Sequence, residues 1–324
     1  MALVFVTRVI PQEGIARLEE AGHEVVVSDK EGVLNKEELC AALAARPYEA
    51  VITLLTDVVD AAVFDAVPAL QICANYAVGF NNIDRVEAAR RGVIVTHTPD
   101  VLTSTVAEHT AALILALSTR TVEGDRFVRA GQFTGWSPML LLGSDLKGKT
   151  LGVIGAGRIG GQVARMMANG FGMRIAYYDI ERDANLESQC NAVFYSTVEE
   201  VLQEAFVVTL HVPLLPSTRH LLNKERLALL SKESYVVNTS RGAVIEEEAL
   251  VAALEKKELA GAALDVFEYE PDLTPGLAEL ENVVLTPHIA SATKETRGDM
   301  ARMAADDIIR VLEGDAPHHP VPAR

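Results

Sequence analysis

The stretch that decides the fold is Leu151-Gly-Val-Ile154-Gly155-Ala-Gly157-Arg158-Ile159-Gly160, which continues into a helical pattern over residues 161–168. Its apolar start is typical of a buried strand, and the three glycines follow that strand directly. In this setting the first glycine permits a tight turn, the second lets the backbone approach a pyrophosphate, and the third lets the helix pack on the strand. The stretch therefore predicts a βαβ unit whose residues 155–160 bind a dinucleotide at a helix N-terminus. A structural glycine turn is the alternative.

Asp179 follows the next predicted strand, residues 174–178, and lies 19 positions after Gly160. An acid about 20 residues beyond the glycines hydrogen-bonds the adenosine ribose hydroxyls and repels the extra phosphate of NADP. The sequence therefore favours NAD(H), while Arg182 nearby leaves the use of NADP(H) open. The alternative role for Asp179 is the N-cap of the following helix.

Short apolar runs alternate with runs of helical period along the whole chain, which predicts an α/β fold with mainly parallel sheets. A chain of 324 residues exceeds what one core usually holds, so two domains are expected. One series of candidate strands lies within residues 1–99 and a second within 150–286, and the apolar helical run 104–118 lies between them. Residues 131–138 and 143–149 form an irregular, glycine-rich stretch.

Composition excludes several classes of partner. The net charge of −16, from 45 acidic and 29 basic residues, disfavours binding to a nucleic-acid backbone. No 18-residue apolar stretch and no basic, apolar leader occurs, so we expect neither a membrane span nor a targeting segment. Three widely spaced cysteines favour a reducing, cytoplasmic location, and no residue is assigned to a metal.

Five segments together are similar to the D-isomer-specific 2-hydroxyacid dehydrogenase family, in the family's order and over nearly the whole chain. They are Asn75-Tyr-Ala-Val-Gly-Phe-Asn-Asn-Ile-Asp84, Thr105-Val-Ala-Glu108, Asn238-Thr-Ser-Arg-Gly242, Asp265-Val-Phe-Glu-Tyr-Glu-Pro271 and Leu285-Thr-Pro-His-Ile-Ala290. Gly135-Trp-Ser-Pro138 resembles the glyoxylate and hydroxypyruvate reductase branch of that family. The resemblance implies two Rossmann-like domains with the active site in the cleft between them. It also implies that residues 1–99 and 290–324 form the substrate-binding domain and residues 100–289 the NAD-binding domain.

By the same resemblance the catalytic residues are Arg241, Glu270 and His288. Reduction of a 2-oxo acid leaves negative charge on the carbonyl oxygen, which needs a proton donor that titrates near neutral pH, and histidine is such a donor. We expect Glu270 to orient the imidazole of His288, and Arg241 to hold the substrate carboxylate or carbonyl through its guanidinium. In isolation the three could be a surface turn charge, a loop carboxylate and a core histidine.

The resemblance also assigns binding residues. The backbone N–H groups of Val78 and Gly79 are expected to bind the substrate carboxylate, with an ordinary strand-to-helix turn as the alternative. His288 and Arg241 complete the substrate site. Further residues expected to contact the cofactor are Thr105, His211, Val212, Pro213, Thr239 and Asp265.

The activity implied is NADH-dependent reduction of a small 2-oxo acid, with glyoxylate or hydroxypyruvate first, and the reverse oxidation. Alternatives are a 3-phosphoglycerate-type or other D-2-hydroxyacid dehydrogenase, a phosphite dehydrogenase, and an NAD-sensing, corepressor-like protein without catalysis. The family implies a homodimer. Trp136 and Met139-Leu-Leu-Leu142 resemble a hydrophobic lid contributed by a partner subunit, and could equally pack a dimer interface.

Overall fold

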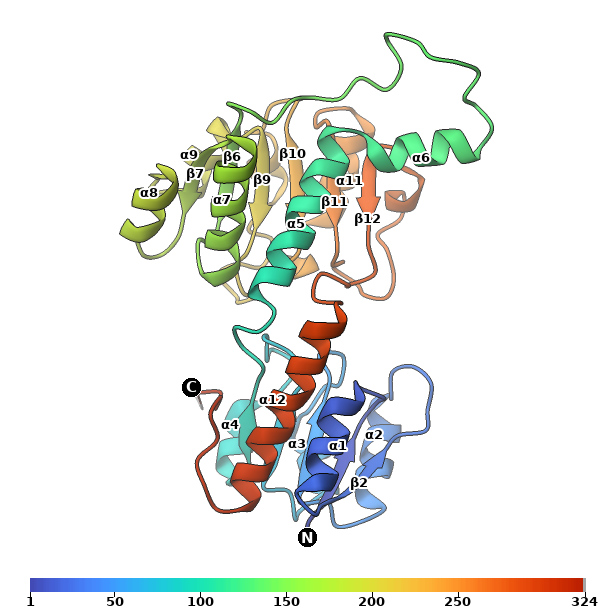
Figure 1. Ribbon diagram of the computed structural model, residues 1–324, viewed down its shortest axis with the longest axis vertical. Helices are drawn as coiled ribbons and strands as arrows, with labels where there is room; N and C mark the ends of the chain where they lie inside the picture. The colour runs from blue at the N-terminus through green and yellow to red at the C-terminus, as the bar shows by residue number, and fades with distance from the viewer. Residues whose placement is uncertain (323–324) are drawn as a thin grey trace. The chain divides into compact units, whose positions relative to one another are not determined.

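The computed structural model describes residues 1–322 and divides into two compact units (Figure 1). Unit 1 comprises Met1–Leu102 and the chain from Ala292 onward, and unit 2 comprises Thr103–Ser291. Each unit is built on a sheet in which all strand pairs are parallel. The predicted α/β class with parallel sheets is therefore confirmed.

Unit 1 has a five-stranded sheet in the order β2-β1-β3-β4-β5. Its strands are β1 (Leu3–Val6), β2 (Glu24–Val27), β3 (Ala50–Thr53), β4 (Ile72–Asn75) and β5 (Ile94–Thr96). Its helices are α1 (Gln12–Glu20), α2 (Lys36–Ala44), α3 (Ala61–Ala66), α4 (Arg85–Arg90) and α12 (Lys294–Leu312). Strands β1, β3 and β4 are buried along their whole length, which explains why they are apolar except for Thr53 and Asn75 at the ends of β3 and β4.

The last helix, α12, returns the chain to unit 1 and packs beside α1, at the other end of the sequence (Figure 1). The two helices approach so closely that a Cβ on Gly14 would lie 2.6 Å from the carbonyl oxygen of Ala301. Only glycine fits there without displacing the backbone of α12. Unit 1 is therefore assembled from both ends of the chain.

Unit 2 has a seven-stranded sheet in the order β12-β11-β10-β9-β6-β7-β8. Its strands are β6 (Thr150–Ile154), β7 (Arg174–Tyr178), β8 (Val193–Phe194), β9 (Val207–Leu210), β10 (Tyr235–Asn238), β11 (Gly261–Leu264) and β12 (Val283–Leu285). Its helices are α5 (Thr103–Ser118), α6 (Thr121–Arg129), α7 (Arg158–Phe171), α8 (Ala184–Cys190), α9 (Val198–Glu204), α10 (Lys224–Leu227) and α11 (Glu247–Glu255), with 3-10 turns at Gly242–Val244 and Leu277–Glu279. The strand order reverses between β6 and β9, and ligands of such sheets bind at the carboxyl ends of the strands around that point.

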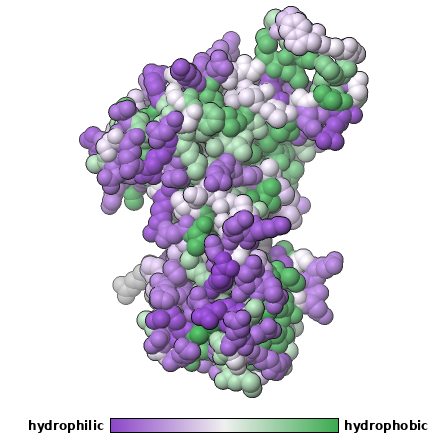
Figure 2. Space-filling view, in the orientation of Figure 1, coloured by the Kyte–Doolittle hydropathy of each residue, from purple (hydrophilic) through white to green (hydrophobic). Residues whose placement is uncertain are grey.

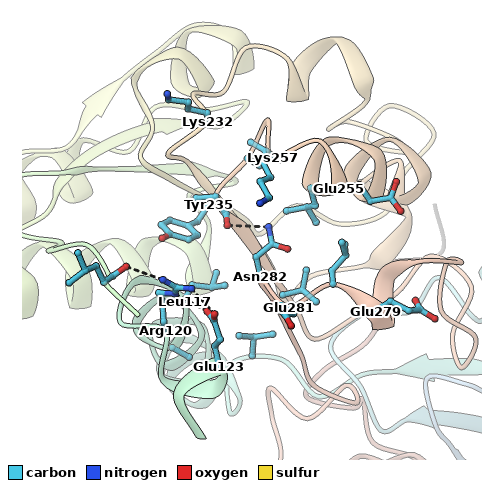
Figure 3. Close-up of a pocket in the computed structure, with 18 residues that line it drawn as sticks. Leu117, Arg120, Glu123, Lys232, Tyr235, Glu255, Lys257, Glu279, Glu281 and Asn282 are labelled. Atoms are coloured by element: carbon cyan, nitrogen blue, oxygen red, sulfur yellow. Dashed lines mark hydrogen bonds and ion pairs between the residues drawn. The ribbon is translucent and has the colours of Figure 1, made fainter. Parts of the chain in front are cut away.

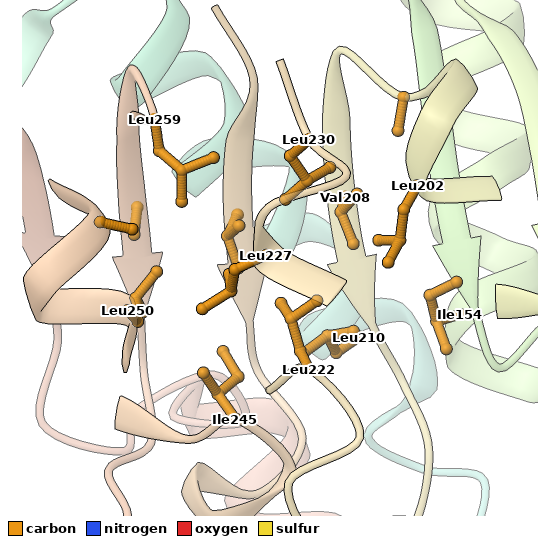
Figure 4. Packing of buried hydrophobic residues seen from close by; sticks show 14 of the residues in the cluster. Ile154, Leu202, Val208, Leu210, Leu222, Leu227, Leu230, Ile245, Leu250 and Leu259 are labelled. Carbon is orange, nitrogen blue, oxygen red and sulfur yellow. The ribbon is translucent and has the colours of Figure 1, made fainter. Parts of the chain in front are cut away.

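Two hydrophobic cores cover the two faces of this sheet. Ile154, Val208 and Leu210 belong to one core, which Leu202, Leu222 and Leu250 complete (Figure 4). Leu151, Val153 and Met167 belong to the other, beneath α5 and α7. Successive side chains of a strand point to opposite faces, so neighbours such as Val236 and Val237 enter different cores.

The chain between α6 and β6 is an extended arm with a mostly exposed surface (Figure 1). It carries large apolar side chains in water: Phe133 is 54% exposed, Trp136 84% and Met139 74%. Apolar side chains gather on the part of the surface that the arm forms (Figure 2). None of the helices within residues 1–322 combines the length and the apolar character needed to cross a bilayer.

Candidate active site

The three glycines of the dinucleotide motif form the turn between β6 and α7. Gly155 has a positive φ of 91°, and a Cβ there would lie 2.8 Å from the carbonyl carbon of His211. A Cβ on Gly160 would lie 2.0 Å from the carbonyl oxygen of Gly155, whereas the space around Gly157 is open. Gly155 and Gly160 thus permit close packing, and Gly157 leaves a bare backbone that a ligand can approach. This turn fits the pyrophosphate of a dinucleotide.

Asp179 lies against this glycine turn. Its carboxylate accepts hydrogen bonds from the N–H of Ala156 at 2.7 Å and of Ile180 at 2.6 Å. The N-cap of the next helix, α8, is Asp183, which accepts from the N–H groups of its first turn. The structure therefore gives the capping role to Asp183 and leaves Asp179 at the rim of the turn.

The segment after β9 borders the same turn. The ring of His211 accepts or donates a 2.9 Å hydrogen bond at Nε2 with the hydroxyl of Thr209, and burial lowers its pKa to about 3. The imidazole is therefore neutral at physiological pH. On the next strand along, the hydroxyls of Thr239 and Thr110 are hydrogen-bonded at 2.9 Å, which ties the end of β10 to α5.

Glu270 and His288 form a hydrogen-bonded pair, with Nδ1 of the imidazole 3.0 Å from Oε2 of the carboxylate. The other carboxylate oxygen accepts the N–H of Phe267 at 2.9 Å. Burial raises the pKa of Glu270, but the bond from His288, its charge, the Phe267 bond and the charge of Arg241 together hold that pKa below its usual value. The carboxylate is therefore ionised at neutral pH. It orients the ring so that Nε2 is the nitrogen able to exchange a proton with a substrate.

Arg241 follows β10 in a turn fixed by Asn238, whose side-chain amide donates to the Arg241 carbonyl at 2.8 Å and whose Oδ1 accepts the Ser240 N–H at 3.0 Å. Burial lowers the pKa of Arg241, and the negative charge of Glu270 opposes that shift. The next residue, Gly242, packs so tightly that a Cβ would lie 1.9 Å from the carbonyl carbon of Phe267. This contact brings the Arg241 turn and the loop carrying Glu270 together.

The backbone around His288 is held by a buried carboxylate. His288 has a positive φ of 55°, a backbone conformation that residues other than glycine rarely adopt. Asp265, fully buried, accepts the N–H groups of Ile289 and Ala290 at 2.8 Å each, and its carbonyl accepts the N–H of His288 at 2.9 Å. The hydroxyl of Thr286 also donates to Asp265, at 2.6 Å. Asp265 therefore keeps His288 in its unusual conformation.

Val78 and Gly79 lie in unit 1, in the turn that follows β4. Nδ1 of His97 lies 2.8 Å from the Val78 carbonyl oxygen, and the side-chain amide of Asn75 donates to the Gly79 carbonyl at 2.9 Å. Both carbonyls are thus engaged by side chains. Thr105 lies in the first turn of α5, in unit 2.

The sequence interpretation missed the residues that hold these groups in place. Asn238 and Thr286 lie inside the sequence segments that carry the family resemblance. Their amide and hydroxyl groups, close in sequence to Arg241 and His288, could therefore have been predicted to support those residues. His97 and His109 could not be found in that way, because their partners are distant in the chain: His97 faces Val78, and His109 lies 3.5 Å from Asp265.

A cavity of about 530 Å³ lies elsewhere in unit 2, at the amino ends of β10, β11 and β12 (Figure 3). Tyr235, Leu117 and Asn282 line it, and Arg120, Lys257 and several glutamates surround them. The side-chain amide of Asn282 is bound to the Ala260 carbonyl at 3.2 Å. None of Arg241, Glu270 and His288 lines this cavity, since they follow the carboxyl ends of the strands.

Comparison with known proteins gives one consistent family. Residues 111–290 match the family described as D-isomer specific 2-hydroxyacid dehydrogenase, NAD binding domain. A glyoxylate reductase of Thermofilum pendens is 47% identical over 317 residues, which is 97% of this chain and 92% of that protein. A glyoxylate reductase of Pyrococcus furiosus is 46% identical over 97% of this chain and 93% of its own.

Solved structures agree with the sequence matches. A protein of Thermus thermophilus superposes with a TM-score of 0.92 at 44% identity, over 99% of this chain and all of that one. The NADPH-dependent glyoxylate/hydroxypyruvate reductase of Sinorhizobium meliloti, solved with NADP and malonate, has a TM-score of 0.87 at 31% identity, over 99% and 97% of the two chains. The chain therefore belongs to the D-isomer specific 2-hydroxyacid dehydrogenase family, whose members are nicotinamide-dependent oxidoreductases.

Proposed function

We propose that this protein reduces a small 2-oxo acid, glyoxylate or hydroxypyruvate, with NADH and catalyses the reverse oxidation. The observation that carries the proposal is the pairing of His288 with the ionised Glu270, in the unit that also holds Arg241 and the glycine turn. The glyoxylate reductases of Thermofilum pendens and Pyrococcus furiosus support the choice of substrate.

In this mechanism the three side chains have separate roles. Arg241 binds the substrate carboxylate or carbonyl and orients the reacting carbon. Bound nicotinamide supplies the hydride in reduction and accepts it in oxidation. His288 donates its Nε2 proton to the carbonyl oxygen as charge develops there, and takes the hydroxyl proton back in oxidation. Glu270 remains ionised, accepts the hydrogen bond from Nδ1 and fixes the orientation of the ring.

The cofactor preference rests on Asp179. Its carboxylate lies at the glycine turn, where it would accept hydrogen bonds from the ribose hydroxyls of NADH and repel the 2′-phosphate of NADPH. The Sinorhizobium meliloti relative is, by contrast, NADPH-dependent. The remaining proposed cofactor contacts are Thr105, Gly155, Gly157, Arg158, Ile159, Gly160, His211, Val212, Pro213, Thr239 and Asp265.

Two further assignments complete the proposal. Val78 and Gly79 bind the substrate carboxylate through their N–H groups, which is supported by the engagement of both their carbonyls by side chains. The exposed apolar arm, with Trp136 and Met139, contacts a second copy of the chain in a homodimer. All three cysteines are free thiols, which suits a reducing compartment such as the cytoplasm.

A turnover screen tests the proposal. The purified protein is mixed with NADH or NADPH and with glyoxylate, hydroxypyruvate, pyruvate or 3-phosphohydroxypyruvate, and the loss of absorbance at the nicotinamide band is followed. We expect the highest kcat/KM with NADH and glyoxylate or hydroxypyruvate. Absence of turnover with every acid, despite NADH binding, would favour a cofactor-sensing protein, and a preference for the phosphorylated acid would favour a 3-phosphoglycerate-type enzyme.

A further inference from the structure

Arg182 lies in the loop between β7 and α8, three residues after Asp179, and its guanidinium is bound to Glu187. Nε donates to Oε1 at 2.6 Å and Nη2 donates to Oε2 at 2.8 Å. Two parallel bonds of this kind are the most directional ion pair that arginine makes with a carboxylate. Although the Arg182 side chain is 67% exposed, its charged group is therefore tied to α8.

Glu187 is in turn anchored to the core of unit 2. Its side chain is only 20% exposed, and Oε1 accepts a 2.8 Å hydrogen bond from the hydroxyl of Tyr177, a fully buried residue of β7. The bonds from Arg182 and then from Tyr177 lower the pKa of Glu187, so the carboxylate is ionised at neutral pH. Arg182 is thus held by an acceptor whose own position is fixed.

The position of this pair matters because of what the loop is expected to contact. In a dinucleotide-binding unit, the loop after the second strand faces the adenosine ribose, and an arginine there can accommodate the 2′-phosphate of NADP. Residues 179–183 read Asp-Ile-Glu-Arg-Asp, so Arg182 is the loop's one basic residue. A carboxylate and a phosphate compete for the same fork of N–H donors.

We propose that Glu187 is a cofactor-specificity residue, which withholds the Arg182 guanidinium from the 2′-phosphate of NADP(H) and so strengthens the preference for NADH. The inference rests on the proposed NADH-dependent function and adds a second device to it. Asp179 acts by repelling the phosphate, whereas Glu187 acts by occupying the cation that would attract it.

The test is a direct binding measurement on Glu187→Gln, which keeps the size and an acceptor for Tyr177 but removes the charge. Dissociation constants for NADPH and NADH are obtained from the change in nicotinamide fluorescence, without substrate or turnover. In this variant the Arg182 guanidinium can form an exposed, charge-assisted contact with the 2′-phosphate. We therefore expect NADPH to bind about fivefold more tightly, and the dissociation constant for NADH to change by less than about twofold. Adding Arg182→Ala to Glu187→Gln is expected to abolish the gain, because the cation is then absent.

A matched control is Glu199→Gln in α9, which removes the same charge from the same unit. Glu199 is paired with Arg226 at 2.8 Å, outside the loop that follows β7. This variant is expected to leave both dissociation constants unchanged, so it excludes a general effect of net charge. NADH binding by each variant reports that the unit is folded.

The outcomes separate this inference from the proposed function. If the parent binds NADPH as tightly as NADH, the proposed NADH preference fails, and the effect of Glu187→Gln on NADPH binding still decides the role of Glu187. If the parent prefers NADH but Glu187→Gln leaves NADPH binding unchanged, or the gain survives Arg182→Ala, the role of Glu187 is overturned while the NADH preference stands.

Discussion

The N–H of Ala290 donates a 2.8 Å hydrogen bond to Oδ2 of Asp265, although 25 positions separate the two residues in the chain. Ile289 donates to the other oxygen of the same carboxylate, and the N–H of His288 reaches the Asp265 carbonyl. One buried acid thereby fixes three consecutive residues, the first of which is the proposed proton donor. The position of the imidazole depends on Asp265 as well as on Glu270.

Asp265→Asn should lower kcat by about tenfold or more and lower Tm. An amide cannot accept from both sides, so at least one buried N–H loses its partner, which costs about 1–3 kcal/mol. The measurements are kcat for glyoxylate reduction and thermal unfolding. Thr286→Val is the control, because it removes a donor to Asp265 but keeps both backbone bonds. If Thr286→Val lowers kcat and Tm as much as Asp265→Asn does, Asp265 does not act by positioning His288 through its backbone bonds.

His288→Ala should reduce kcat for 2-oxo acid reduction by at least about a hundredfold, within the usual range for loss of a general acid. NADH binding should change little, since the proposed role of the imidazole is proton donation in the transition state. Steady-state kinetics and fluorescence titration with NADH check the two halves of this prediction. A variant that keeps its turnover would remove His288 from the mechanism.

Glu270→Gln should lower kcat for 2-oxo acid reduction by about tenfold or more. The carboxylate of Glu270 makes two hydrogen bonds, one oxygen with Nδ1 of His288 and the other with the N–H of Phe267. An amide has a single acceptor oxygen, so the variant loses one of these bonds and the imidazole loses its fixed orientation. The measurements are kcat for glyoxylate reduction and NADH binding, for parent and variant. A variant that keeps the parent's kcat would mean that Glu270 does not position His288.

Asp179→Ala should relax the preference for NADH over NADPH more than it reduces turnover with NADH. The change removes an acceptor for the ribose hydroxyls and the charge that repels the 2′-phosphate. The ratio of kcat/KM values for the two cofactors is the measurement. If that ratio is the same in parent and variant, Asp179 only supports the glycine turn through Ala156.

Lowering the pH should destabilise the parent protein more than it destabilises the His211→Gln variant. The pKa of His211 in the folded protein is about 3, below its ordinary value of 6.5, so between these values the unfolded chain binds a proton that the folded one does not. The free energy of unfolding therefore falls as pH falls through this window, by up to about 1.4 kcal/mol per pH unit. Thermal unfolding at pH 7, 6 and 5 tests this. Parallel curves for parent and variant would contradict it.

Local pattern determined much of this protein. The strand Thr150–Ile154 and the glycines after it could be predicted because a tight turn and a close helix-strand approach admit few other residues. The apolar helical run 104–118 likewise corresponds to α5, Thr103–Ser118, because its residues favour a helix that is apolar on nearly every face. The short helix Val198–Glu204 was not recognised, although Thr197 and Glu200 form a capping box at its start.

The hydrogen bonds that join the proposed site residues to one another were decided by the tertiary structure. The family resemblance led us to expect Glu270 to orient His288, but the two residues lie in separate motifs. Their hydrogen bond forms because the parallel strands β11 and β12 end at one edge of the sheet. The pair of Arg182 and Glu187, and the bonds of Asp265, likewise depend on where each chain segment turns. A periodic pattern specifies which face of an element is buried, whereas a hydrogen bond of about 3 Å requires the packing of whole elements, to which distant residues all contribute.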